Sequence, residues 1–343
     1  MSDSVFKVAI VGAGFFSQFH YDAWSRIDNT KIQACCDLDI DKARSVAEKF
    51  QIQNAYTDLD ELLKNNTIDL LDIVSPPPTH LQNVKLAAQK GINVVCQKPF
   101  GETLEQAQEI TRIADEMGIE VIVHDNFRFM PWYRKIKSVL EQGILGDVLN
   151  AQFNLRPGDG QGEDAYLSRQ PYFQQMEKFL IHETAIHFID TFRYLFGEVT
   201  SVYADLRRCN PVIKGEDSGV VIFELASGMR AVFDGNRLID HSSSNTRRTM
   251  GEMWIEGTKA VLSLDGEGRI WLREHGSLQL EPVEYQWQDQ GYGGDCVFAL
   301  CQHVKEYFRD HGSVENKGRE YLVNIELENA VYQSNKEGRK ITL

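Results

Sequence analysis

Apolar and polar residues follow two different patterns along this chain, and the first pattern gives way to the second near residue 126. Before it, short continuous apolar runs at 5–11, 31–39, 68–78, 92–99 and 119–126 alternate with segments of helical periodicity. Continuous apolar runs are typical of strands buried on both faces. Repeated strand–helix units with short links therefore predict a doubly wound parallel sheet.

The second pattern is an alternation of apolar and polar residues, which predicts a largely antiparallel sheet with one buried face. It occupies 148–156, 199–208, 218–228, 229–236, 252–274 and 280–288, with helical patterns near 179–196, 295–310 and 318–337. The expected fold class is α/β, with a parallel N-terminal sheet and a C-terminal α/β domain built on an open, mostly antiparallel sheet. If the free face of that sheet is apolar, pairing of two copies would cover it, so we expect a homodimer or homotetramer.

The first apolar run ends in a glycine turn followed by a helical pattern, "VGAGFFSQ". In a dinucleotide fold Gly12 makes the turn and Gly14 lets the pyrophosphate approach the backbone, with Phe15 and Phe16 at the helix start. Ser17 stands where the fingerprint has a third small residue.

An acidic residue, Asp37, ends the second strand about 20 residues further on, where a carboxylate accepts from the ribose hydroxyls and repels a 2′-phosphate. The pattern favours NAD over NADP. The alternative is that Asp37 only caps the next helix.

Three later strands end in polar residues: Ser75-Pro76, Lys98-Pro99 and Asp125-Asn126. The carboxyl ends of parallel strands meet at one edge of the sheet, so these residues should line one crevice. Pro99 disfavours the helical conformation for Lys98 and so directs the amine toward the cofactor. The alternative for Lys98 is a solvated strand end.

The helix at 179–196 carries Glu183 and His187 four residues apart, hence on one face, with Thr191 on nearly the same side. His182-Glu183 followed by His187 is not a zinc helix, because that motif needs histidines four apart and here they are five apart. We therefore expect no metal. The alternative for His187 is a hydrogen-bonded core histidine.

Composition narrows the possible partners. The 343 residues are 42% hydrophobic and 25% charged, and the formal net charge of −14 argues against nucleic acid as a partner. No apolar stretch is long enough for a membrane helix, and the N-terminus lacks a secretory pattern. The six cysteines form no CxxC pair, which is typical of a reducing compartment, so we expect a cytoplasmic protein.

With these residues assembled, the chain resembles the Gfo/Idh/MocA family (glucose–fructose oxidoreductase / inositol dehydrogenase) over essentially its whole length. The matching stretches are "VAIVGAG", "CCDLD", "VSPPPTH", "VCQKP", "NFRF.P" and "ETAIHFID". "QKPF", "HDNFRF", "QPYF" and "IKGEDS" look most like the branch that contains D-apiose dehydrogenases, which oxidise a branched aldose at its anomeric carbon.

The resemblance implies a Rossmann domain over 1–125 and a substrate-binding and oligomerisation domain over 126–343, whose last helix and terminus can pack back on the first domain. It also implies NAD(P)-dependent oxidation or reduction of the CH–OH groups of sugars, inositols or related polyols.

Carried over by position, the family's Glu-Lys-Pro lysine is Lys98, and its catalytic helix supplies Glu183 and His187. Gln97 replaces the usual Glu, Glu183 the usual Asp, and Ala185 the common Gly. In this scheme Lys98 accepts the substrate's hydroxyl proton while His187, held by Glu183, orients the hydroxyl. The reverse assignment, with His187 as the base, stays open.

Further contacts are expected on the same basis. The cofactor contacts are Ser75, Pro76, His80, Gln97, Asn126 and Arg128, and the substrate contacts are Arg156, Tyr172 and Thr191. Arg128 and Arg156 have ordinary ion pairing as the alternative. Two rival functions are a redox-neutral NAD-dependent glycosidase and a non-catalytic NAD-binding sensor.

Overall fold

The structure is a computed structural model that describes residues 4–310 and 312–343. The chain divides into two compact units, of which the first comprises Met1–Asn126 and Asp295–Val323 and the second Phe127–Gly294 and Asn324–Leu343. The chain therefore leaves the first unit and returns to it.

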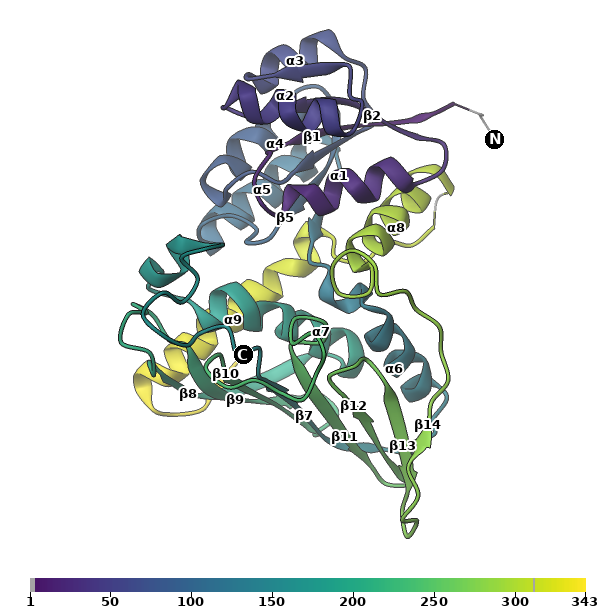
Figure 1. The fold of residues 1–343 in the computed structure, drawn as a ribbon, viewed down its shortest axis with the longest axis vertical. Coiled ribbons are helices and arrows are strands. Elements are labelled where there is room, and N and C mark those ends of the chain that lie inside the picture. The colour runs from purple at the N-terminus through teal and green to yellow at the C-terminus, as the bar shows by residue number, and fades with distance from the viewer. Residues whose placement is uncertain (1–3, 311) are drawn as a thin grey trace. The chain divides into compact units, whose positions relative to one another are not determined.

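The first unit is built on a parallel sheet of six strands within the described residues (Figure 1). The strand order is β3-β2-β1-β4-β5-β6, and every neighbouring pair is parallel. This is the Rossmann order, in which ligands bind beyond the carboxyl ends of the strands. The strands are β1 (Phe6–Val11), β2 (Thr30–Cys36), β3 (Asn54–Tyr56), β4 (Leu70–Ile73), β5 (Asn93–Gln97) and β6 (Val121–His124).

The helices of this unit begin and end at recognisable caps. Asp39, Asp58 and Thr103 accept from backbone N–H groups at the starts of α2, α3 and α5, and Gly118 ends α5 in the left-handed conformation (φ 68°). The helices between the strands are α1 (Ser17–Arg26), α2 (Ile40–Lys49), α3 (Leu59–Asn65), the 3₁₀ turn η1 (Pro77–Thr79), α4 (His80–Ala88) and α5 (Leu104–Met117).

The returning segment Asp295–Val323 departs from the expected division at residue 126. Its helix α8 (Cys296–Asp310) buries the stripe Cys296, Val297, Leu300, Cys301 and Val304 and packs on α1. Asp295 also accepts from both terminal guanidinium nitrogens of Arg26, at 2.8 and 2.6 Å. An apolar stripe and an ion pair thus place this segment in the first unit.

The second unit carries a sheet of nine strands within the described residues, in the order β14-β13-β12-β11-β7-β10-β9-β8-β15. Only the pairing of β7 with β10 is parallel among those described. The strands are β7 (Val148–Leu155), β8 (Val199–Arg207), β9 (Ser218–Leu225), β10 (Arg230–Asn236), β11 (Gly251–Gly257), β12 (Ala260–Leu264), β13 (Ile270–Glu274), β14 (Glu281–Pro282) and β15 (Ile341–Thr342). The expected α/β fold class, with a parallel and a mostly antiparallel sheet, is confirmed.

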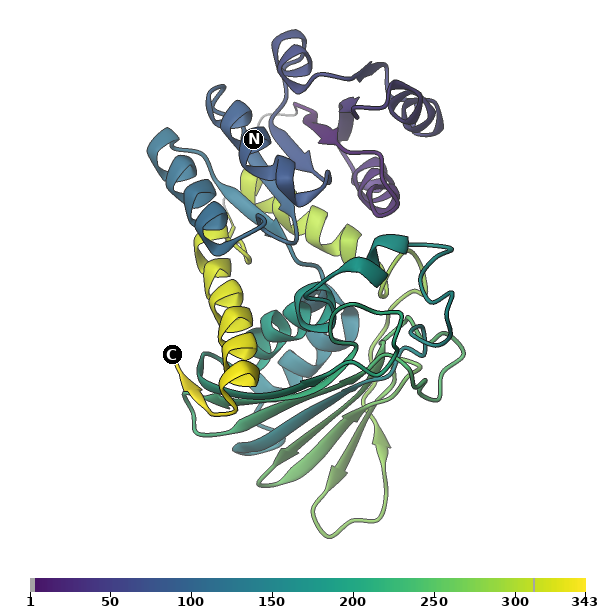
Figure 2. The same ribbon diagram turned by 90° about the vertical axis from the view of Figure 1, so that its left-hand side faces the viewer.

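Helices of the second unit lie over one face of this sheet (Figure 2). They are η2 (Phe127–Phe129), α6 (Pro131–Glu141), α7 (Ile186–Phe196) and the part of α9 (Gly318–Glu337) from Asn324 onward. On the covered face, Phe188 of α7 stacks on Phe153 of β7 at 4.0 Å and packs against Phe233 of β10. The alternating pattern of the strands therefore supplies one buried face, as expected.

The segment at 280–288 forms less strand than its alternation predicted. Only Glu281 and Pro282 pair, with β13, and most of the neighbouring residues are exposed. The alternation still governs burial, because Val283, Tyr285 and Trp287 are partly buried and Trp287 packs edge-on against Trp132 of α6. The segment therefore packs through alternate side chains without extending the paired strand beyond Pro282.

Candidate active site residues

The glycine loop after β1 has the geometry that close backbone packing requires. Gly12 adopts φ +110°, and a Cβ atom there would lie 2.7 Å from the carbonyl carbon and oxygen of Val74. Only glycine combines that conformation with so close an approach. At Gly14, by contrast, a Cβ atom would meet nothing within 4 Å. The loop is thus tightly held at Gly12 and open at Gly14, where a pyrophosphate would lie.

The start of α1 leaves its N-terminal amides without a side-chain cap, because Phe16 at the N-cap position makes no such hydrogen bond. Uncapped amides at a helix start are suited to an anion. Ser17 is buried, and its Oγ donates to the carbonyl of Gly14 at 2.7 Å. The serine therefore fits where the fingerprint has glycine or alanine, and it ties the helix to the loop. Phe15 is half exposed.

Asp37 follows β2 directly and supports the same loop. Its Oδ2 accepts from the backbone N–H of Ala13 at 2.7 Å, and its Oδ1 accepts from Asp39 N–H at 2.9 Å. A carboxylate offers about four acceptor positions, so both oxygens retain capacity for ribose hydroxyls. The capping role that was the alternative for this position belongs to Asp39, whose side chain accepts at the start of α2. Together, the loop and Asp37 fit NAD.

The turn after β4 is fixed by its own side chains. Ser75 Oγ shares a hydrogen bond with Thr79 Oγ1 at 2.6 Å, and His80 Nε2 donates to the Ser75 carbonyl at 2.7 Å. Pro76 precedes the 3₁₀ turn η1. His80 is fully buried, and burial lowers the pKa of its imidazole.

Lys98 follows β5 immediately and is half-buried, with a cis peptide to Pro99. Its backbone N–H donates to Gln97 Oε1 at 2.7 Å. At the end of the neighbouring strand β6, Asn126 is buried and its amide donates to Cys296 Sγ at 3.1 Å. Since β4, β5 and β6 are adjacent and parallel, Ser75, Lys98 and Asn126 follow strands that end at one edge of the sheet.

In the second unit, the helix expected over 179–196 begins as a π-helix at Leu180–Ala185 and continues as α7. Glu216 Oε1 accepts from the N–H groups of Phe179 and Ile181 and from the hydroxyl of Tyr332. This buried carboxylate therefore anchors the start of the turn that carries Glu183. Single π-turns inside helices are frequent at functional sites.

His187, one turn into the helix, is 6% exposed and stacks on Phe127 with ring centroids 4.0 Å apart and planes 7° apart. Parallel stacking at this distance fixes the plane of the imidazole. Thr191 is fully buried and its hydroxyl donates to the His187 carbonyl at 2.7 Å, which is a helix-internal bond.

Arg237 is a neighbour of Glu183 that sequence reasoning missed. Its Nη1 donates to Thr184 Oγ1 at 2.7 Å and lies 3.7 Å from Glu183 Oε2, which itself accepts from Thr184 Oγ1. Its Nη2 donates to Asp159 Oδ2 at 3.0 Å. Burial lowers the pKa of the guanidinium, but Asp159, Tyr166 and Glu183 together raise it above its usual value.

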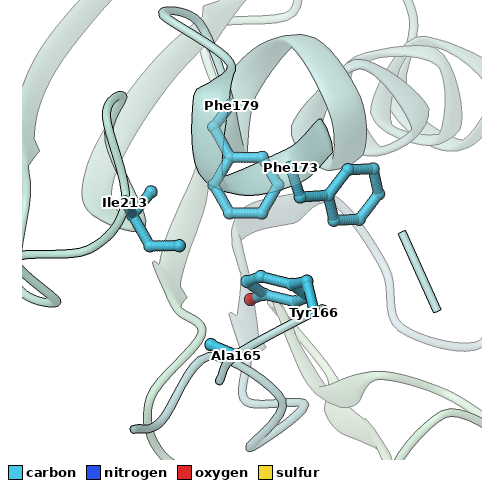
Figure 3. Packing of buried hydrophobic residues seen from close by; sticks show 5 residues of the cluster. All are labelled: Ala165, Tyr166, Phe173, Phe179 and Ile213. Carbon is cyan, nitrogen blue, oxygen red and sulfur yellow. The ribbon is translucent and has the colours of Figure 1, made fainter. Parts of the chain in front are cut away.

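An aromatic cluster surrounds this guanidinium, which is 2% exposed. The carbon at its centre lies 5.2, 5.7 and 4.6 Å from the ring centres of Tyr166, Phe173 and Phe179. These rings pack together with Ala165 and Ile213 (Figure 3). The sequence does carry a signal for Arg237 in the alternation of inward and outward residues. Ala231, Phe233 and Gly235 point inward along β10, and Arg237 falls on the next inward position.

The remaining predicted residues have these partners. Arg128 forms a bidentate ion pair with buried Asp190, at 2.7 and 2.6 Å. Arg156 donates to Asp234 Oδ2 at 2.9 Å and to two backbone carbonyls. Tyr172 is 58% exposed, and its hydroxyl accepts from Gln170. Among the described residues no group of three His, Cys, Asp or Glu side chains could hold a metal ion, and no helix is long and apolar enough to cross a bilayer.

Comparison with known proteins decides the family. Residues 6–125 match the oxidoreductase family with an NAD-binding Rossmann fold, and residues 133–263 match the GFO/IDH/MocA C-terminal domain. The chain is 30% identical to D-apiose dehydrogenase of Paraburkholderia graminis over 98% of this chain and 90% of that protein. The chain belongs to the GFO/IDH/MocA oxidoreductase family.

Other relatives agree with this placement. D-apiose dehydrogenase of Rhizobium rhizogenes is 28% identical over 100% of this chain and 99% of its own length. An oxidoreductase from Agrobacterium radiobacter, solved with NAD⁺, L-tartaric acid and magnesium, superposes with a TM-score of 0.89 at 27% identity, covering 99% of this chain and 98% of that one. This GFO/IDH/MocA chain is thus an oxidoreductase that uses NAD, bound by its Rossmann domain.

Proposed function

We propose that this protein is an NAD-dependent dehydrogenase that oxidises a CH–OH group of a sugar or polyol, with an aldose such as D-apiose as the first candidate and inositols next. The observation that supports this most is the near full-length similarity to two D-apiose dehydrogenases. The tight glycine loop and the position of Asp37 in the Rossmann unit support the same proposal, since both suit a bound NAD.

In this reaction bound NAD supplies the hydride acceptor. As the carbon loses its hydride, the hydroxyl oxygen becomes a carbonyl oxygen and its proton must pass to a base. We assign that role to Lys98, because it follows β5 at the edge where a Rossmann sheet holds its ligand. His187, whose ring plane is fixed by stacking on Phe127, binds and orients the substrate hydroxyl. Glu183 holds the imidazole of His187 in this scheme. An aldose oxidised at its anomeric carbon leaves as a lactone.

NADH formation followed by absorbance, across aldoses including D-apiose, inositols and uronates, tests the proposal. The expected result is accumulation of NADH with at least one free sugar or polyol. Glycoside cleavage with no net NADH would instead identify a redox-neutral glycosidase. NAD binding without either reaction would identify a sensor.

Replacement of the lysine tests the assignment of the base. Lys98→Met should lower turnover by roughly two to four orders of magnitude, the contribution typical of a general base. NAD affinity should stay nearly unchanged, since the proposed phosphate and ribose contacts are the glycine loop after β1 and Asp37. Lys90→Met is a matched control, because Lys90 is exposed after α4. Turnover that survives in Lys98→Met would refute the role of Lys98.

We further propose that two copies pair through the open face of the nine-stranded sheet, in the cytoplasm. Its outward residues include Tyr203, Val220 and Trp254, each about two fifths exposed. Apolar side chains on three strands of one face suit a self-complementary interface. Five of the six cysteines are buried, which fits their use as small apolar residues in a reducing compartment. Sedimentation of the purified protein measures its oligomeric state, and a monomer at micromolar concentration would exclude pairing through the sheet.

A further inference from the structure

A buried polar network lies behind the end of β5, within the first unit. It joins His20 of α1, Asp72 of β4 and Gln97 of β5, and the first two are fully buried. His20 Nδ1 lies 2.8 Å from Asp72 Oδ2, and Trp24 Nε1 donates to the same oxygen at 2.7 Å. Gln97 Nε2 lies 3.2 Å from His20 Nε2. None of these contacts belongs to the hydride or proton transfer described above.

The donors and acceptors of this network have one consistent arrangement. The backbone N–H of Lys98 can only donate, so the Gln97 atom that it meets at 2.7 Å is the oxygen. The Gln97 amide nitrogen, a donor, therefore faces His20 Nε2, which must accept. The proton of the neutral imidazole then sits on Nδ1 and is donated to Asp72. His20 is thus neutral, in the Nδ1–H form.

The groups around His20 agree with a neutral ring. The His124 ring of β6 lies 4.0 Å away between centroids, and two imidazolium rings at that distance would repel. Phe16, just before α1, packs edge-on against the His20 ring, with centroids 5.7 Å apart. Other titratable neighbours of Asp72 are the thiols of Cys96 on β5 and Cys301 on α8 and the phenol of Tyr21 on α1. Burial first, and Asp72 second, raises the pKa of both thiols, and burial, Cys35 and Asp72 raise the pKa of Tyr21. Asp72 is therefore the only carboxylate in contact with His20 among the described residues.

We infer that Gln97 and His20 are a matched pair of positioning residues, in which neutral His20 orients Gln97 so that Gln97 holds the backbone of Lys98 without placing a negative charge beside its amine. The inference rests on the proposed role of Lys98. It gives a physical reason for the departure from glutamate at position 97. A glutamate there could meet His20 only if Nε2 also carried a proton, because an ionised carboxylate has no donor.

The test is Gln97→Glu, followed by two measurements. Long-range ¹H–¹⁵N spectra of histidine-labelled protein report which ring nitrogens are protonated, and His20→Asn assigns the signal. We expect one proton, on Nδ1, in the wild type and two in Gln97→Glu. In kinetics, the acid limb of the pH profile of kcat/KM should shift to higher pH by about one pH unit, because a nearby carboxylate favours the charged form of the Lys98 amine.

Gln89→Glu is the matched control, since Gln89 is exposed at the C-terminal end of α4, remote from the carboxyl edge of the sheet. It should leave both the spectrum and the pH profile unchanged. A proton on Nε2 of wild-type His20, or a pH profile of Gln97→Glu that matches the control, overturns the inference. Failure of the proposed function would be seen separately, because the wild-type protein would then form no NADH with any sugar or polyol. The spectra need no substrate, so they test the protonation of His20 independently of activity.

Discussion

Replacement of Asp37 should separate its support of the glycine loop from the ribose binding that we propose for the same carboxylate. Its Oδ2 holds the glycine loop through Ala13 N–H at 2.7 Å, and its remaining acceptor capacity suits the ribose hydroxyls of NAD. Asp37→Asn removes the charge but leaves an amide oxygen that can still accept from Ala13. Asp37→Ala removes both. The two variants therefore differ in loop support and agree in the loss of charge.

The expected magnitudes follow from these contacts. A hydrogen bond to a charged group contributes about 1.5–3 kcal/mol, so losing one ribose contact should lower kcat/KM for NAD by roughly 10- to 150-fold. Loss of the negative charge also removes repulsion of a 2′-phosphate, so kcat/KM for NADP should rise in Asp37→Asn. In Asp37→Ala the freed Ala13 N–H should weaken use of both cofactors, by about 1–3 kcal/mol.

The assay is kcat/KM for NAD and for NADP with one sugar substrate, in both variants and in Asp39→Asn. Asp39 is an exposed carboxylate two residues away that caps α2, so its variant should keep the wild-type preference. If the NAD to NADP ratio in Asp37→Asn equals that of Asp39→Asn, the assignment of Asp37 to the ribose is wrong.

Two further predictions concern stability. Arg237→Met should lower the free energy of unfolding by about 1–3 kcal/mol in urea titration, because it removes the buried guanidinium's hydrogen bonds to Thr184 and Asp159 and leaves Asp159 with only Arg169 and Tyr166 as partners among the described residues. Arg207→Met, at an exposed ion pair, should cost much less, and equal losses would contradict the buried role. The pKa of buried His80 is lowered from 6.5, so below pH 6.5 the unfolded chain takes up a proton that the folded chain resists. Stability should fall by at most about 1.4 kcal/mol per pH unit from that group as the pH decreases, and His80→Asn should reduce the fall between pH 7 and 5; an unchanged fall would refute it.

The fold class was predictable because its signals are local. Strand periodicity, the glycine turn at Gly12 and the helix caps each depend on a few neighbouring residues, and they agree with one another. The π-turn at Leu180–Ala185 was not predictable, because its anchor is Glu216, more than thirty residues away in sequence. An amphipathic helix such as α8 likewise shows that one face is buried but not which partner buries it.

The candidate site divides in the same way. Gly12, Asp37 and Lys98 stand at strand ends that the sequence already marks, whereas Arg237 and His20 act through contacts between distant elements. Arg237 sits in the inward phase of β10, where a charge is costly unless it is paired, and that anomaly is a usable signal. For His20 the sequence shows only a histidine in the first helix. Its contact with Gln97 becomes visible only once the positions of α1 and β5 in the fold are known.

The return of Asp295–Val323 to the first unit has a consequence for synthesis on the ribosome. Domains usually fold in order as they emerge, at about 5–20 residues per second, but this nucleotide-binding unit lacks α8 until about 200 further residues have been made. For roughly 10–40 s the surface of α1 that α8 covers faces water. A nascent chain of residues 1–126 should therefore need shielding by a chaperone, and expressing that fragment alone should give an aggregation-prone product.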